Sequence, residues 1–277
     1  MPTRPPPLPA DTARAAKAVF NRSNLYLTIG DQMESLFAGI DPTDLATLVG
    51  RPASSFVLLA LVTLFQFAES LTDQQAAEAS RTRMDWKYAL HLPLSHPGLD
   101  FAGLCEFRQQ LLLDTTAQRA FEHVLTRLTE IGLVGSRSRQ RLQLGDVLAA
   151  VCTLTRLEQT AEAMCLALEA VAARQPEWLR MIALSHWYER YNRALLYSHL
   201  PHTIKEQEAL AQAIGSDALH LLETVAGSNG SGLARLPEVQ NLRQMWDRQF
   251  EQQEGQARWR ASGCASCPLR LSAPPRG

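Results

Sequence analysis

The stretch LTDQQAAEASRTRMDWKYALHLPLSHPGLDFAGLCEFRQQLL, Leu71–Leu112, decides the fold of the N-terminal part of the chain. Thr72 and Gln75 have the spacing of a capping box, in which each side chain bonds to the other's backbone, so a helix is predicted to start there. Pro93 and the turn residues after it interrupt the helical pattern. A further helix is expected where apolar spacing resumes, through Leu113. The stretch therefore predicts short helices joined by turns.

The segment before this stretch, Phe56–Ser70, is apolar on nearly all sides. A helix that is hydrophobic around its whole circumference is buried, so this one is expected to be central to the core. A turn of three residues, ending at Thr72, is expected to join it to the next helix. Two helices joined by so short a turn resemble a helix-turn-helix, although a plain helical hairpin is the commoner arrangement.

The remaining pattern is also helical, and the chain is predicted to be mostly α. A capping box is expected at Thr115 and Gln118. Gly215 is expected to end a helix. Helices are predicted over 11–20, 56–70, 72–83, 85–92, 100–113, 115–132, 147–173, 177–198, 204–214, 218–226 and 239–253, with an extended piece and a short helix in 24–36 and a short strand at 143–148.

Composition excludes several classes of protein. The net charge is −1, and neither half of the chain is basic, so any DNA-binding surface must be a local patch. The Pro-rich start has no signal-peptide pattern, and the apolar run Phe56–Phe67 is too short to cross a membrane. We expect a cytoplasmic location and no membrane partner. The sequence contains no HExxH motif and one CxxC pair, Cys264 and Cys267, so no metal site is predicted.

The words LTDQQAAEA, DWKYALHLPL and FRQQLL, at these spacings, resemble the N-terminal domain of bacterial insertion-sequence transposases of the DDE type. The resemblance implies a helical N-terminal domain that binds the terminal inverted repeats of the element and assembles with other transposase subunits. It also implies an RNase-H-like catalytic domain, in which three carboxylates hold Mg²⁺ for DNA strand cutting and joining.

The first of those three carboxylates is missing from its expected place. The stretch QRLQLGDVLAAV, 140–151, is similar to the family's sequence around its first Asp, but that position holds Gln143. Asp146 is a weak substitute and is better explained as a cap of the following helix. The segments that carry the other two acids are expected beyond about residue 260 and are not present. We therefore expect a truncated transposase with no cofactor of its own and no catalytic residues, although its family is enzymatic.

The expected organisation has four parts. Residues 1–20 form a flexible Pro-rich lead, and 21–135 form the helical transposase domain. Residues 136–260 form the helical part of an incomplete catalytic domain, and 261–277 form a disordered tail that reads as out of frame. The basic segment 136–141 marks the expected domain boundary.

DNA contacts are expected from positive side chains near the family words, because Arg and Lys neutralise phosphates and Arg also reads guanine. The alternative for each residue is an ordinary solvent-exposed charge. An alternative function is a helical interaction module that pairs with, or inhibits, full-length transposase. The candidate DNA-binding residues are Arg81, Arg83, Lys87, Arg108, Arg137, Arg139 and Arg141.

Overall fold

The computed structural model describes residues 5–20, 24–38, 53–131, 143–192, 201, 203–227 and 232–260. The prediction of a mostly α protein is confirmed, since the described residues form helices and one two-stranded antiparallel sheet. The chain divides into two compact units, the first containing Met1–Val151 and the second containing Cys152–Ser266. The division falls inside a helix, whereas the boundary expected at 136–141 lies outside the described residues.

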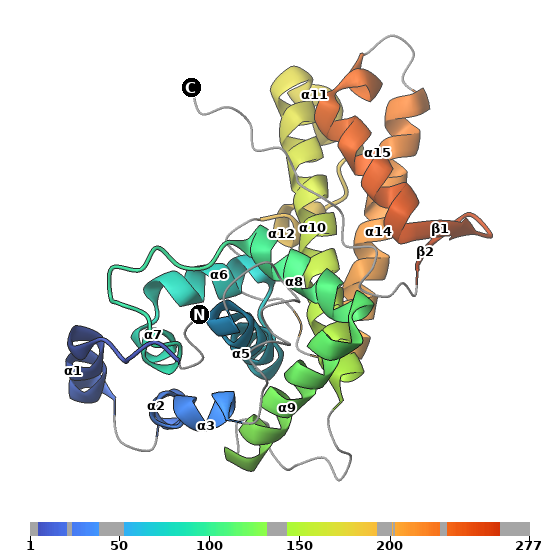
Figure 1. The fold of residues 1–277 in the computed structure, drawn as a ribbon. Helices are drawn as coiled ribbons and strands as arrows, with labels where there is room; N and C mark the ends of the chain where they lie inside the picture. The colour runs from blue at the N-terminus through green and yellow to red at the C-terminus, as the bar shows by residue number, and fades with distance from the viewer. Residues whose placement is uncertain are drawn as a thin grey trace. The chain divides into compact units, whose positions relative to one another are not determined.

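The first unit is a set of helices around one long, central helix, α5 (Figure 1). Helix α5 packs against α6, α8 and α9, and its residues from Phe56 to Gln66 are buried with the exception of Leu58, which is partly exposed. The prediction of a buried core helix is therefore confirmed. The helices of this unit are α1 (Ala10–Val19), α2 (Leu25–Asp31), α3 (Met33–Phe37), α5 (Ala53–Glu69), α6 (Asp73–Thr82), α7 (Met84–Ala89), α8 (Phe101–Leu113) and α9 (Thr115–Ile131).

Two local predictions in the first unit are wrong. The piece after Asn24 is helical rather than extended, because the Asn24 side chain accepts hydrogen bonds from the backbone N–H groups of Tyr26 and Leu27 and so caps α2. Helix α9 is capped by Asp114 and not by Thr115. The Asp114 carboxylate accepts from the N–H groups of Thr116 and Ala117, at 2.8 and 3.4 Å.

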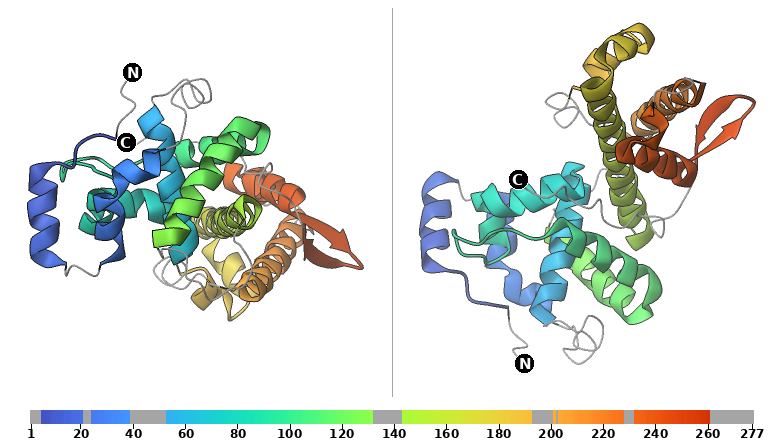
Figure 2. Two further views of the ribbon diagram at one scale, coloured as in Figure 1. Left: turned by 60° about the horizontal axis from the view of Figure 1, so that its bottom comes forward. Right: turned by 90° about the horizontal axis from the view of Figure 1, so that it is seen from above.

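The second unit contains α11 (Pro176–Ile182), α12 (Trp187–Arg190), α14 (Ile204–Gly227), a 3-10 turn η1 (Leu233–Arg235), α15 (Pro237–Gln249) and a hairpin of β1 (Phe250–Gln253) and β2 (Gln256–Trp259). Its core also includes much of α10 (Leu144–Arg174), the helix that crosses from the first unit. The hairpin extends outward from the end of α15 (Figure 2). Its two-residue turn, Glu254 and Gly255, has positive φ at both positions, as a type I′ turn requires.

Close packing explains why α14 is one helix where two were predicted. Gly215 lies inside α14 and does not end it. A Cβ atom at Gly215 would lie 2.2 Å from the ring of Phe250, and the Trp246 indole N–H donates to the Gly215 carbonyl at 2.9 Å. The glycine therefore lets α15 and the hairpin approach α14. A glycine at a helix end and a glycine at a close helix contact give the same sequence signal, so the sequence predicts a helix end at Gly215.

Three other predictions are also wrong. The expected strand at 143–148 is the start of α10, and the helix expected over 177–198 is interrupted after Ile182, where α11 ends. The helix expected to run to residue 253 stops at Gln249, because the backbone becomes extended at Phe250. The Phe250 ring is fully buried. No single described helix is long and apolar enough to cross a membrane; α5 and α6 meet that length and apolarity only as a bent pair.

Candidate nucleic-acid interface

The junction of α5 and α6 is defined by hydrogen bonds at both helix ends. Helix α5 ends with Ser70 in the left-handed region, at φ 55°, and Leu71 N–H donates to the Gln66 carbonyl at 2.9 Å. This pattern is a Schellman cap, usually made with glycine. Helix α6 then starts with the capping box that the sequence predicted, in which Thr72 and Gln75 bond reciprocally. The axes of the two helices turn through 110° across this junction.

A buried ion pair fixes α6 to α8. Arg108 on α8 donates through Nη2 to the carboxylate of Asp73, the first residue of α6, and the two side chains are only 1% and 4% exposed. The amide of Gln66 on α5 donates to the other Asp73 oxygen at 2.8 Å. One carboxylate therefore joins three helices. Arg108 was a candidate DNA contact, but its guanidinium lies inside the fold.

The Arg83 side chain is also bound by other residues of the protein. Its guanidinium donates to Glu69 and to Asp85, and it stacks over the rings of Tyr26 and Trp86 at about 5 Å. Burial alone would lower the pKa of Arg83, but hydrogen bonds to the two carboxylates outweigh it and raise the pKa. The side chain keeps 34% exposure. Arg83 thus ties the end of α5 to the start of α7.

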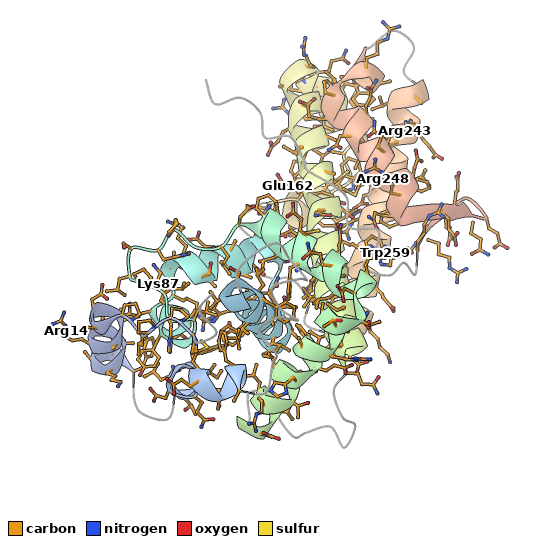
Figure 3. The ribbon with its side chains drawn as sticks, in the orientation of Figure 1. Arg14, Lys87, Glu162, Arg243, Arg248 and Trp259 are labelled. Atoms are coloured by element: carbon orange, nitrogen blue, oxygen red, sulfur yellow. The ribbon has the colours of Figure 1, made fainter. Side chains whose placement is uncertain are left out.

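Lys87 is buried beneath the loop that follows α7 (Figure 3). Its ammonium donates to the backbone carbonyls of Leu94 and His96. Burial, with the nearby Lys87 charge as a second cause, lowers the pKa of His96. A lysine that binds its own loop carbonyls holds that loop, and in this arrangement it does not present its charge to solvent.

Arg81 is the candidate that lies on the surface. Its side chain is 57% exposed and makes a two-pronged ion pair with Glu78, one turn earlier on α6, at 2.9 and 2.6 Å. Arg137, Arg139 and Arg141 lie outside the described residues. Among the sequence candidates within the described ranges, Arg81 thus has the accessible guanidinium.

The exposed face of α6 is a feature that the search for positive charges missed. Gln74, Glu78, Arg81 and Thr82 are exposed, while Asp73, Ala76, Ala79 and Ser80 are buried. The exposed positions follow a spacing of four and three residues, which puts them on one side of the helix. This spacing was visible in the sequence, but only the packing of α6 on its neighbours showed which side faces outward.

The start of α10 does not fit the family's metal site. Gln143 is neutral and precedes the helix, and the Asp146 carboxylate accepts from the Gln143 backbone N–H at 3.1 Å. Asp146 is the third residue of α10 and bonds back to the residue before the helix, whereas the sequence predicted it as the cap of a helix that begins at Val147. No group of three His, Cys, Asp or Glu side chains that could hold a metal ion is found among the residues the structure describes.

A polar cluster in the second unit was not expected from the sequence. The Asp217 carboxylate on α14 accepts from Tyr191 Oη at 2.7 Å, from His186 Nε2 at 3.0 Å and from Arg190. Burial alone would raise the pKa of Asp217, but these hydrogen bonds lower it. Burial, and then the charge of Asp217, raises the pKa of Tyr191. The cluster attaches the α12 segment to α14.

The hairpin in the second unit is held by another buried arginine. Arg156 on α10 donates to the side chain of Gln249 at 2.6 Å and to the Arg260 carbonyl, and it stacks on Trp259 of β2, 4.3 Å from the ring centroid. The hydrogen bonds and the stacking together fix the hairpin to the helical core. Arg156 is therefore a structural residue and does not point to a ligand.

Comparison with known proteins gives a family match in the N-terminal part of the chain. No curated protein and no solved structure matches the chain. Residues 15–110 match the family model described as Transposase domain (DUF772). The matched range runs from α1 to α8 and includes the α5–α6 junction, the Asp73–Arg108 pair and the Arg83 cluster. The match supports a transposase domain in the N-terminal part of this chain.

Proposed function

We propose that the first unit binds DNA at the terminal inverted repeats of an insertion sequence and takes part in transposase assembly, without catalysing strand transfer itself. The observation that carries this proposal is the match of residues 15–110 to a transposase domain. The position of Gln143, where the resembling family has its first acidic residue, favours the absence of catalysis. A neutral amide does not replace the charge of a carboxylate in a two-metal site.

A gel-shift titration on the terminal repeats of the element that encodes the chain tests DNA binding. Binding to the repeats should exceed binding to shuffled duplexes of equal composition. It should also fall with salt, by about 0.9 in log–log slope for each phosphate neutralised. Equal affinity for repeats and shuffled duplexes at every salt concentration would contradict a role in end recognition.

A strand-cleavage assay with Mg²⁺ or Mn²⁺ on the same repeats tests the absence of catalysis. We expect no metal-dependent cutting by the wild-type chain, and none by Gln143→Asp. The described residues contain no group of three His, Cys, Asp or Glu side chains that could hold a metal ion, so one added carboxylate should not complete a site that needs three. Cutting that is lost in Asp146→Ala would place an active site at the start of α10 and refute this part of the proposal.

Assembly with other transposase subunits has a separate observation in its favour. The end of α8 exposes two adjacent apolar side chains, Leu112 at 38% and Leu113 at 87%. Contiguous exposed apolar surface marks sites of protein–protein association. Light scattering over a range of concentrations should show a mass above that of the monomer, and Leu113→Gln should weaken association. A monomer at all concentrations, also when mixed with full-length transposase, would contradict assembly.

A further inference from the structure

Helices α5 and α6 have the geometry of a helix-turn-helix. In that motif two helices at about 90–120° are joined by a turn of three or four residues. Here the turn is Ser70, Leu71 and Thr72, and the helix axes turn through 110°. The left-handed Ser70 and the capping box at Thr72 define the end of one helix and the start of the next. The bend is therefore built into the chain.

The support behind α6 is equally well defined. The Asp73–Arg108 ion pair and the small residues Ala76 and Ala79 hold its inner face, and α6 packs on α8, α5 and α7. In Figure 1, α6 and α8 lie side by side along one side of α5, as their packing requires. A helix held this way presents its outer face in a fixed orientation, which sequence reading requires.

The outer face carries side chains of the kinds that read base edges. Gln pairs with adenine, Arg with the O6 and N7 atoms of guanine, Glu with the amino group of cytosine, and Thr contacts the methyl group of thymine. On α6 these are Gln74, Arg81, Glu78 and Thr82, all exposed. The face has one positive and one negative group, so it has no general attraction for phosphate. It is better suited to specific than to non-specific contact.

We propose that α6 is the recognition helix of this unit, which enters the major groove of duplex DNA and reads base edges with Gln74, Glu78 and Arg81. The proposal rests on the proposed function and adds to it the element, the groove and the reading residues. In the free protein Arg81 is held by Glu78, and both side chains are more than half exposed. Breaking so exposed a pair costs little, so the guanidinium is available to a guanine.

The experiment selects binding sites from a pool of duplexes with a randomised core and compares the wild-type chain with Arg81→Ala and Gln74→Ala. Each substitution should relax the preference at one base pair or two adjacent ones. Each should also weaken binding to the selected site by roughly fivefold to 150-fold, the range for a lost base contact. Binding to shuffled duplexes should change less than twofold, and methylation of a guanine N7 in the site should block the wild type but not Arg81→Ala.

Arg127→Ala is the matched control. Arg127 belongs to the same unit and makes an exposed ion pair of the same spacing with Glu130, with side-chain exposures of 41% and 59%. It lies on α9, which packs against α5, α8 and α3. We expect its site preference and affinity to equal those of the wild type. Thermal melting of all variants should agree within a few degrees, because the substituted side chains are on the surface.

Two results would overturn the proposal, and they differ from each other. If the wild type selects a site and both α6 variants keep the same site and affinity, then α6 does not read DNA, while the proposed function stands. If the wild type selects no site at all, the proposed function fails and the recognition helix fails with it.

Discussion

The ion pair between Asp73 and Arg108 should contribute far more to stability than its counterpart on the same helix, Arg81 with Glu78. The first pair is 1% and 4% exposed, and the second is 57% and 55% exposed. Asp73→Asn keeps the shape of the side chain but leaves a buried guanidinium without its carboxylate. Removing one partner of a buried pair costs about 3–5 kcal/mol. Glu78→Gln should have little effect on stability, because solvent screens an exposed pair.

Hydrogen exchange measured on peptides of α5, α6 and α8 is the suitable assay, because a chain with two units need not unfold in one step. Protection in these peptides should fall by roughly two to four orders of magnitude in Asp73→Asn, since about 1.4 kcal/mol is a factor of ten. It should fall less than tenfold in Glu78→Gln. Peptides of α14 and α15 serve as the internal reference.

The double variant Asp73→Asn with Arg108→Met separates the charge effect from simple loss of contact. It removes the buried charge together with its partner, so protection should return most of the way to the wild-type value. If Asp73→Asn loses no more protection than Glu78→Gln, the argument from burial is refuted. If the double variant is as unstable as the sum of the single variants, the two residues are not coupled.

Three further predictions follow from single positions. Ser70→Gly should raise the free energy of unfolding by about 1 kcal/mol, because glycine adopts the left-handed conformation without strain. Urea denaturation measures this change, and an equal rise in the free energy of unfolding for Ser70→Ala would contradict it. Gly215→Ala should lower the melting temperature and cost about 1–3 kcal/mol of stability, because the added Cβ meets the ring of Phe250. Gly145→Ala is the control and should leave the melting temperature unchanged, because its Cβ meets nothing within 4 Å. Equal effects of the two substitutions would show that the contact with Phe250 is unimportant. The lowered pKa of Asp217 means that its carboxylate stabilises the fold above its ordinary pKa of 3.8 and that this contribution is lost as the pH falls through the lower, folded-state value. The stability difference between wild type and Asp217→Asn should therefore be full near neutral pH and vanish in acid, and a difference independent of pH from neutral to strongly acidic solution would count against it.

The positive side chains near the family words show the limit of reading a site from a sequence. The sequence does not distinguish Arg81, Lys87 and Arg108, because each is a cation close to a conspicuous motif. The fold places Arg81 on the surface, Lys87 against loop carbonyls and Arg108 on a buried carboxylate. Which cation finds an internal partner depends on residues distant in the chain, such as Asp73 for Arg108. The residues next to each cation in the sequence do not show which distant residue it will contact.

Local signals determined much of the secondary structure from the sequence alone. The capping box at Thr72 and the all-apolar α5 were predicted from residues within a few positions, because helix ends and helix burial depend on neighbours along the chain. Tertiary contacts decided the rest. Gly215 stays inside α14 because Phe250 needs the space, and the exposed face of α6 is set by α8 packing on the opposite side. The spacing of side chains along a helix defines its faces, but which face is exposed is decided only when another element covers one of them.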